Sequence, residues 1–530
     1  MAQITNDMEW LLDIFSHPKR KPTPPDVEKI KLNQLISKLG FFYEKFRNAI
    51  DYNEEHLLRR VAIERILRRH ILFLQERRAP KIAKTLVYEF IRAKYLPNNE
   101  LPESIIDELS VTLEKYLNII NYIFGSQLPE ARKLAKWTID MASCEINEQL
   151  NPIDREMAIA NMMYSHLVDN LTFIKTDIDE KEKNLQIYLA VLKNLLKADL
   201  PALRYALLKL HLPNWKQLDQ SEIRSFCHNI SIIKNKIDKH LAHPLNFQLS
   251  RTIRPQSVFF ATLKEVIEKN NDNAKEVLSD PDILEEKIED IALLNYQRIR
   301  GKLIGTIFRV IIYILLTKTT LAFILELPYD LVLAGKINWY VLAINVIFHP
   351  LLMLLVALTI RVPGIKNTQI IVGEIKKIVY GEPRKIVFKP KNSLRPGSFA
   401  YFIFNFVYLV MFAISFGIVF GFLKLLHFNI LSGILFIFFL SIVSFFGFRL
   451  RNIALQLSVI PRKDNFTNFI VDFLSLPVIR VGRFFSNNFS RINIFLYIFD
   501  FIIETPFKML IEFLENAVSF INDKREEIIE

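Results

Sequence analysis

The amino-acid sequence predicts an all-α membrane protein: a soluble helical domain, then a four-helix transmembrane region, then C-terminal amphipathic helices. Four apolar segments after Lys302 are long enough to cross a bilayer, whose hydrocarbon core of ~30 Å needs roughly 20 apolar residues. Only Gly40 and Gly125 precede Gly301, which disfavours folds rich in strands and tight turns. Lysine and arginine gather on one side of the apolar segments, as the positive-inside rule describes for membrane proteins.

Residues 1–21 form a predicted amphipathic N-terminal segment. Asp7, Glu9 and Asp13 stand where a secretory signal would carry positive charge, so a signal peptide is not expected. A short amphipathic helix docks on a membrane surface or packs against its own domain, and the sequence leaves both open. Three prolines within residues 22–25 separate this segment from the next, because proline lacks the backbone donor that a helix interior needs.

Residues 26–300 are predicted to form a cytoplasmic helical domain, either a bundle or an array of helices. Apolar residues recur there at helical spacing, and breaks containing proline fall near residues 96–99, 151–152, 212–214 and 243–244. The first 300 residues hold 44 basic and 42 acidic side chains and are nearly neutral. A nucleic-acid partner is therefore not expected, because such binding needs a net basic footprint.

The transmembrane region is predicted to occupy residues 301–450. Its four spans cover about residues 303–325, 337–360, 401–423 and 430–448. From Gly301 onward the chain has 24 basic and 14 acidic residues, which gives +10 of the total charge of +12. The connection 361–398 has nine basic and two acidic residues, whereas the turns at the other end of the spans hold one lysine each. The positive-inside rule therefore predicts a multi-pass protein whose N-terminal domain, basic loop and C-terminus are cytoplasmic.

Six basic side chains of the loop 361–398 are predicted to contact anionic lipid headgroups. The alternative is that their charge only sets the topology. The six residues are Lys376, Lys377, Arg384, Lys385, Lys389 and Lys391.

Residues 451–530 are predicted to form C-terminal interfacial helices, broken at Pro477 and Pro506. Acidic residues inside their apolar runs, such as Asp472 and Asp500, would be costly in lipid. A fifth span at residues 492–503 is short for a crossing.

Four polar residues inside the predicted spans are candidate site residues: Arg309, Lys318, Asn345 and His349. Asn345 and His349 share one face of the second span, and Lys318 of the antiparallel first span falls roughly level with Asn345. Because an ionisable group at such depth is a functional candidate, one interpretation is a polar track for an ion, a proton or a small solute. In the other, Lys318 and Arg309 extend to opposite membrane interfaces, and His349 hydrogen-bonds a neighbouring helix.

Small residues in the third span, Ala413, Gly417 and Gly421, recur at four-residue intervals. This spacing lets helix backbones approach closely, so the third span is predicted to pack against the fourth or against a second copy of the chain.

Motifs that carry chemistry are scarce. Cys227, His228, His240 and His243 offer sulfur and nitrogen ligands, but their spacing matches no closed zinc site, so no metal is expected. Phosphate-loop, dinucleotide-binding, metalloprotease and nucleophile-elbow motifs are absent from the sequence, so no cofactor is expected and enzymatic activity stays open.

The leading functional hypothesis is a membrane-anchored scaffold or adaptor that displays its helical domain to a protein partner. A channel or transporter that uses the Lys318–His349 seam is the alternative, and a lipid-modifying enzyme is a third reading without nameable catalytic residues. The expected partners are membrane lipids, a protein bound by the helical domain and, as a further option, a second copy of the chain.

Overall fold

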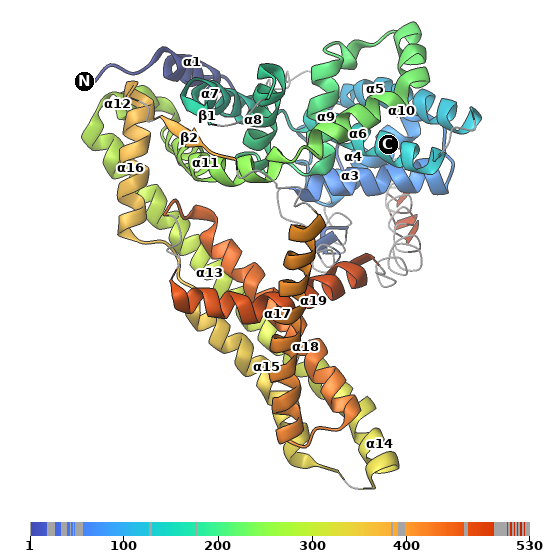
Figure 1. Ribbon diagram of the computed structural model, residues 1–530. Helices are drawn as coiled ribbons and strands as arrows, with labels where there is room; N and C mark the ends of the chain where they lie inside the picture. The colour runs from blue at the N-terminus through green and yellow to red at the C-terminus, as the bar shows by residue number, and fades with distance from the viewer. Residues whose placement is uncertain are drawn as a thin grey trace. The chain divides into compact units, whose positions relative to one another are not determined.

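The computed structural model describes residues 2–18, 27–32, 40–42, 44–45, 47, 57–126, 130–174, 178–335, 337–382, 385–390, 398–460, 465–491, 506, 509–510, 513–514, 517, 520–521 and 524. Helices dominate these residues (Figure 1), which confirms the predicted all-α fold class. Two short strands, β1 (Leu171–Phe173) and β2 (Ile386–Phe388), also occur. The chain divides into a helical unit, Trp10–Ile253 with Ile494–Glu530, and a spanning unit, Met1–Glu9 with Arg254–Asn493.

The helical unit is built from short and medium-length helices that end near each of the predicted proline-containing breaks. Local signals fix several starts: the Asp219 side chain accepts the amide of Glu222 and the Glu222 side chain accepts the amide of Asp219, a capping box. The elements are α3 (Leu58–Arg68), η2 (Arg69–Phe73), α4 (Ala79–Arg92), α5 (Ser104–Gly125), α6 (Ala131–Leu150), α7 (Asp154–Asn170), α8 (Glu180–Asn194), α9 (Leu200–His211), η3 (Trp215–Gln217) and α10 (Gln220–Leu241). Two further helices, α1 (Asn6–Ser16) and α11 (Leu245–Lys269), belong partly to each unit.

The N-terminal helix α1 buries its apolar face within the protein. Met8, Leu11 and Phe15 are all buried. The Arg155 guanidinium donates to the carbonyl oxygens of Phe15, at 2.8 Å, and of His17, at 2.6 Å, which satisfies acceptors at the end of the helix. The sequence left open whether this segment docks on a membrane surface or packs within the protein, and in the structure it packs within the protein.

Among its described residues, the spanning unit contains four helices that are long and apolar enough to cross a membrane: Pro281–Val332, Trp339–Thr359, Tyr401–Leu425 and Ile430–Leu457. The predicted spans overlap these helices, but the first helix runs over residues 281–332 rather than 303–325, and the fourth ends at residue 457 rather than at 448. The elements here are η4 (Asn271–Asn273), α12 (Ala274–Ser279), α13 (Pro281–Leu321), η5 (Ala322–Glu326), α14 (Leu327–Tyr329), η6 (Asp330–Ala334), α15 (Trp339–Thr359), α16 (Ile365–Tyr380), α17 (Ser398–Leu425), α18 (Ile430–Ala454), η7 (Leu455–Leu457) and α19 (Phe466–Arg491).

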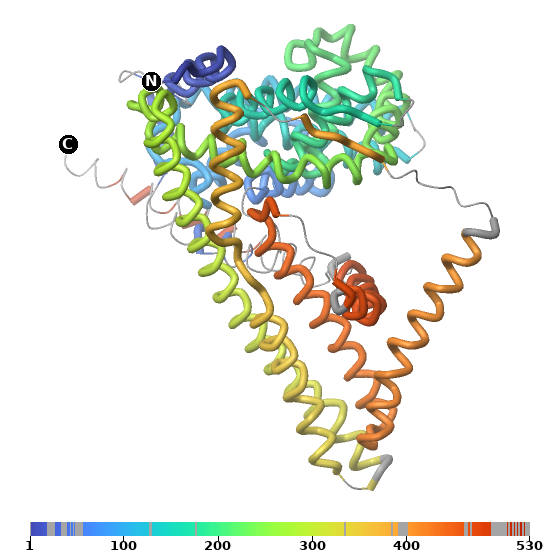
Figure 2. Tube along the Cα trace, turned by 60° about the vertical axis from the view of Figure 1, so that its left-hand side comes forward, coloured from blue at the N-terminus to red at the C-terminus, as the bar shows by residue number. Residues whose placement is uncertain are grey.

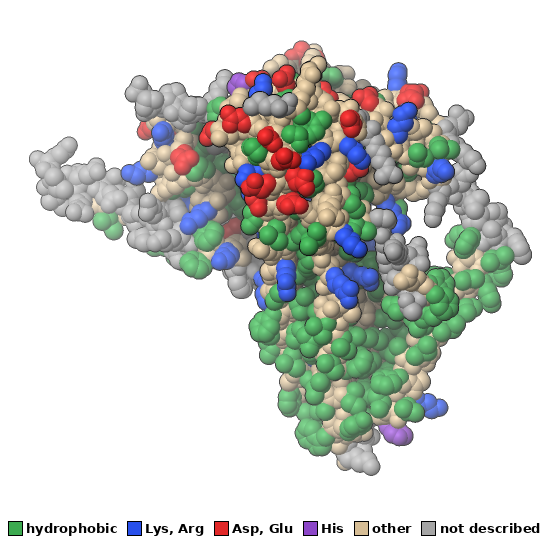
Figure 3. All heavy atoms as spheres, turned by 90° about the vertical axis from the view of Figure 1, so that its left-hand side faces the viewer, with side chains coloured by type: hydrophobic (Ala, Val, Ile, Leu, Met, Phe, Trp, Pro, Cys, Tyr) green, Lys and Arg blue, Asp and Glu red, His purple; other side chains and the backbone are tan. Residues whose placement is uncertain are grey.

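Helices α13, α15 and α18 pack around one apolar core. Its buried residues are Leu303, Ile314, Met353, Val443, Leu450 and Ala454. A side chain on Gly447 of α18 would put its Cβ 2.6 Å from Cγ1 of Val356, so this glycine lets α18 approach α15 closely. Figure 2 shows α17 diverging from α18 after their shared turn. Figure 3 shows the apolar surface of the spanning helices and the Lys and Arg side chains that gather where it ends.

Two segments differ from the sequence expectation. The basic connection 361–398 contains helix α16, because Ile371, Ile375 and Ile378 form a buried stripe at helical spacing. Helix α19 runs through Pro477, where the sequence predicted a break. Residues 492–503, considered for a fifth span, lie outside the described part of the chain.

Candidate functional site

Polar side chains from four elements of the spanning unit converge in one buried cluster. Lys318 of α13, Glu326 of η5, Asn345 and His349 of α15 are 0% exposed, and Ser432 of α18 is 2% exposed. These five residues are called the polar cluster below. Because these side chains are buried, each polar atom depends on a partner inside the protein.

Glu326 reaches the cluster because the first spanning helix widens at its end. The turn Ala322–Glu326 is a π-helix and precedes Pro328. In a regular α-helix the Pro328 ring would clash with the carbonyl of Ile324, and a wider turn is one way in which a helix accommodates such a disturbance. Glu326 lies eight residues after Lys318, so both residues occupy the same side of the helix.

The Glu326 carboxylate is the centre of the cluster. The Nδ2 of Asn345 donates to its two oxygens at 2.8 and 2.7 Å, and the Ser432 hydroxyl donates to Oε2 at 3.0 Å. The Lys318 ammonium lies 3.6 Å from Oε1 and 4.6 Å from the centre of the Phe439 ring. The buried negative charge is thus balanced by a lysine and held by two neutral donors, which is the arrangement that makes a desolvated ion pair tolerable.

His349 extends the cluster toward the middle of the spans. Its Nδ1 lies 3.1 Å from the carbonyl oxygen of Asn345, and its Nε2 lies 3.0 Å from that of Phe436. A neutral imidazole donates through one nitrogen only, whereas an imidazolium donates through both. The two carbonyls therefore offer the ring a place for one additional proton.

The cluster has a polar side and an apolar side. Toward the turns, Nδ2 of Asn429 donates to Oδ1 of Asp330 at 2.6 Å. In the other direction lie the apolar residues Met353 and Val443, both 0% exposed. Two cluster atoms, Nζ of Lys318 and Oδ1 of Asn345, have no hydrogen-bond partner among the described residues. One accepting and one donating group would satisfy them, and a small polar molecule supplies both.

The structure thus brings Lys318, Asn345 and His349 together but leaves Arg309 apart. Arg309 is exposed, and its Nε donates to the carbonyl of Gly305 at 3.1 Å. Glu326 and Ser432 were missed by sequence reasoning. Glu326 was counted as a charge of the first turn, although its spacing of eight from Lys318 would have placed both on one face. Ser432 has no comparable sequence signal.

The remaining candidate residues lie elsewhere in the spanning unit. Ala413, Gly417 and Gly421 are exposed, and no atom lies within 4 Å of a Cβ added at either glycine. Lys376 pairs with Glu285 at 2.5 Å and Lys377 with Glu374 at 2.9 Å. Lys385 and Lys389 are exposed, whereas Arg384 and Lys391 lie outside the described residues.

Two of the histidines considered for zinc have other contacts. His240 Nδ1 lies 2.8 Å from Oε2 of Glu182, and His228 Nδ1 lies 2.8 Å from the carbonyl oxygen of Arg224. Within the described ranges, His, Cys, Asp and Glu side chains form no group of three suited to a metal ion.

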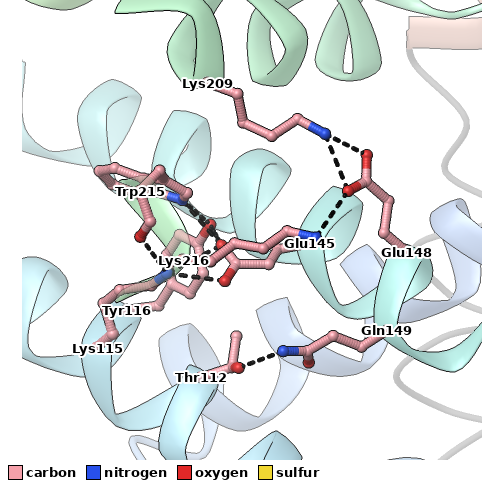
Figure 4. A network of polar contacts seen from close by, with 9 residues as sticks. All are labelled: Thr112, Lys115, Tyr116, Glu145, Glu148, Gln149, Lys209, Trp215 and Lys216. Carbon is pink, nitrogen blue, oxygen red and sulfur yellow. Dashed lines mark hydrogen bonds and ion pairs between the residues drawn. The ribbon is translucent and has the colours of Figure 1, made fainter. Parts of the chain in front are cut away.

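A second buried network lies in the helical unit (Figure 4). Glu145 of α6 accepts from Lys115 Nζ at 2.8 Å, from the Tyr116 hydroxyl at 2.7 Å and from Trp215 Nε1 at 2.8 Å. Lys115 Nζ also donates to the carbonyl oxygen of Trp215 at 2.9 Å. Burial raises the pKa of the Tyr116 hydroxyl and lowers that of Lys115. The network fixes the turn between α9 and α10 on α5 and α6.

Asp140, also on α6, lacks such a set of donors. It is 5% exposed, and its Oδ1 has no hydrogen-bond partner in the described part of the chain. Burial, together with the nearby Glu64 carboxylate, raises the pKa of Asp140 to about 7.

Comparison of the chain with protein-family models, with curated proteins and with solved structures gives no match. Function is therefore inferred from the chain's own residues.

The Lys318–Glu326 pair makes a prediction about stability. Lys318→Met leaves a buried carboxylate without its countercharge and is expected to cost about 3 kcal/mol, and Glu326→Gln is also destabilising. The double variant recovers most of the loss, because no net charge remains buried. Thermal unfolding of the detergent-solubilised chain measures the three changes, with Arg309→Met as an exposed control. Strictly additive losses in the double variant would contradict a coupled pair.

Asp140 predicts a pH dependence of stability. Its carboxyl titrates near 4 in an unfolded chain but at about 7 in the folded one. Between these values the unfolded state releases the proton and the folded state keeps it, so stability falls as the pH rises from about 4 to about 7. Asp140→Asn is expected to remove this slope and to stabilise the chain by up to about 4 kcal/mol at pH 8. Melting temperatures from pH 4 to 8 test this, and the exposed Asp169→Asn should leave the slope unchanged.

Proposed function

We propose that this chain is an integral membrane scaffold, anchored by its spanning helices and binding a protein partner through its helical unit. The observation that carries the proposal is the closure of the polar cluster. A pore needs a continuous polar or hydrated path, but beyond His349 the buried residues Ile314, Met353 and Val443 are apolar. This packing supports an anchor held in register by its buried polar residues.

The distribution of charge supports the predicted orientation. Arg298, Arg300, Arg361, Arg449 and Arg451 are exposed at one end of the spanning helices, where Figure 3 shows basic side chains. The described turn between α17 and α18, at the other end, offers Lys424 and His427. By the positive-inside rule the first end faces the cytoplasm, together with the N-terminal domain and the C-terminus.

The helical unit supports a role in binding through its surface. Three of its buried residues, Lys115, Glu145 and Trp215, bind one another (Figure 4), rather than facing a site for a small molecule. With these groups paired inside the helical unit, its outer surface is the part available to a partner.

The scaffold hypothesis predicts that partners depend on the helical unit. Full-length protein, purified in mild detergent, should retain at least one other protein in a fixed ratio. A chain without residues 26–253 should insert in the membrane and lose that protein. The double variant Lys318→Met/Glu326→Gln should keep it, because the anchor plays no part in recognition. Partners that stay with the truncated chain, or a full-length chain that purifies alone, would contradict the hypothesis.

A second candidate function is uptake of a proton, a cation or a small polar solute. It is favoured by the unsatisfied Lys318 Nζ and Asn345 Oδ1 and by the acidic residues Glu326 and Asp330 on the side of the turns. In this alternative the apolar core is a gate that opens in a second conformation.

Flux into liposomes separates the two functions. If the cluster transports, His349→Ala and Lys318→Ala should each lower proton or solute uptake about tenfold, while Arg309→Ala on the exposed face of α13 should not. Uptake that is absent from the wild-type chain, or equal in all variants, removes the transport function.

A further inference from the structure

Two atoms of the polar cluster remain unsatisfied although the side chains that carry them are fully buried. Lys318 and Asn345 are 0% exposed, and Nζ of the first and Oδ1 of the second have no hydrogen-bond partner in the part of the chain that the structure describes. An ammonium group has three donors, and an amide oxygen accepts hydrogen bonds through two lone pairs. Leaving them unmade inside a protein is costly, most of all for the charged group.

The orientation of the Asn345 amide is fixed by its surroundings. Its Nδ2 faces three acceptors, which are the two oxygens of Glu326, at 2.8 and 2.7 Å, and the carbonyl oxygen of Ser432, at 3.4 Å. Rotating the amide by half a turn would aim Oδ1 at these acceptors instead. The unpartnered oxygen therefore cannot be satisfied by turning the side chain over.

The Lys318 ammonium is short of acceptors. Its paired oxygen, Oε1 of Glu326, lies 3.6 Å away, beyond the range of a direct hydrogen bond. The Phe439 ring, with its centre 4.6 Å from Nζ, stabilises the charge but takes up only one side of the group. Asn345 donates to the same oxygen of Glu326, so the two unpartnered atoms belong to one site rather than two.

A buried lysine of the helical unit shows what a complete set of acceptors looks like. Lys115 is 8% exposed. Its Nζ donates to both oxygens of Glu145, at 2.8 and 3.0 Å, and to the carbonyl oxygen of Trp215, at 2.9 Å. Each of its three donors thus has an acceptor from the protein, which Lys318 does not.

The charge of the cluster selects a neutral ligand. Lys318 and Glu326 carry opposite charges, and a neutral His349 adds none. An added cation would lie beside the ammonium and an added anion beside the carboxylate, and either would leave a net charge buried. A neutral molecule that both donates and accepts satisfies Oδ1 of Asn345 and Nζ of Lys318 together. Because every residue of the polar cluster is at most 2% exposed, the molecule is enclosed, and water is the smallest that fits the chemistry.

Hydrogen-bonding groups lead to the cluster from the turns. Asp330 accepts from Nδ2 of Asn429 at 2.6 Å, and Asn429 is half-buried. The Oδ1 of Asn429 accepts the amide of Ser432 at 2.7 Å, and the hydroxyl of Ser432 belongs to the polar cluster. On the other side, Met353 and Val443 are buried and apolar. Water therefore finds partners on the side of the turns and none on the side of the apolar core.

We propose that the polar cluster binds a water molecule between Nζ of Lys318 and Oδ1 of Asn345, and that this site exchanges with the turn end alone. The inference rests on the membrane anchor of the proposed function and not on its protein partner. It also narrows the second candidate function, because the ligand that the resting cluster accepts is neutral and of the size of water, and it enters from the turns.

Transfer of magnetisation from water to lysine side chains tests the site. The full-length chain, with isotope-labelled lysine, is reconstituted in phosphatidylcholine vesicles and measured by solid-state NMR. The signals of Lys318, Lys115 and the exposed Lys366 are assigned by their loss in single Lys→Arg variants. Lys318 is expected to receive magnetisation severalfold faster than Lys115, at a rate approaching that of Lys366. A transfer to Lys318 as slow as that to Lys115 would overturn the proposal, whether or not a protein partner of the helical unit is found.

The direction of access is measured separately, so that an unstable lysine variant leaves the proposal testable. In a chain with Cys144→Ala and Cys227→Ala, Ser432→Cys and Val443→Cys are introduced singly on α18, where both residues are buried. A membrane-impermeant thiol reagent is then added on either side of the vesicle membrane. The cysteine at 432 should react only from the side that the turns face, and the one at 443 from neither. A cysteine at 432 that stays unmodified, or equal reaction at both positions, would contradict entry from the turns.

Discussion

The Glu326 carboxylate joins the three helices that form the anchor. Lys318 and Glu326 come from one continuous helical segment, Asn345 from α15 and Ser432 from α18, and all four meet at this one group. In water such a set would be worth little, because solvent competes for every partner. Inside a bilayer the alternative to each contact is an unsatisfied polar group in hydrocarbon, so the cluster specifies which helix faces meet. The apolar core below it supplies packing but little specificity, since lipid tails are as apolar as leucine.

This arrangement depends on backbone irregularities that spanning helices tolerate. The π-turn Ala322–Glu326 turns the acid inward just before Pro328, and Pro350 follows His349 inside α15. Each proline removes a backbone donor, and each lies beside a polar side chain within the protein, where irregular backbone is tolerated at membrane depth. The irregular turns and the polar side chains therefore occur together. The backbone departs from regular helical geometry where polar side chains are present to compensate for the missing donor.

The extent to which sequence reasoning succeeded follows from the strength of each signal. Four long apolar runs predicted the spans, and the spacing of Asn345 and His349 predicted that they share one face; both are buried in the structure. Glu326 was not predicted as a site residue, because the count of charges assigned it to a turn, whereas a π-turn places it inside the bundle. Helix α16 was not predicted, because the nine basic residues of this connection favoured a loop over the apolar stripe of Ile371, Ile375 and Ile378. Ser432 could not have been predicted, since its role depends on how α18 is rotated against α15, a property of packing that no local pattern encodes.

Charged side chains on the first spanning helix are stabilised in two ways, and the difference follows from geometry. Arg309 lies on an exposed face and bonds a carbonyl one turn toward the basic end of its helix, so it reaches toward water along its own helix. Lys318 faces the bundle and is neutralised by an acid of the same chain.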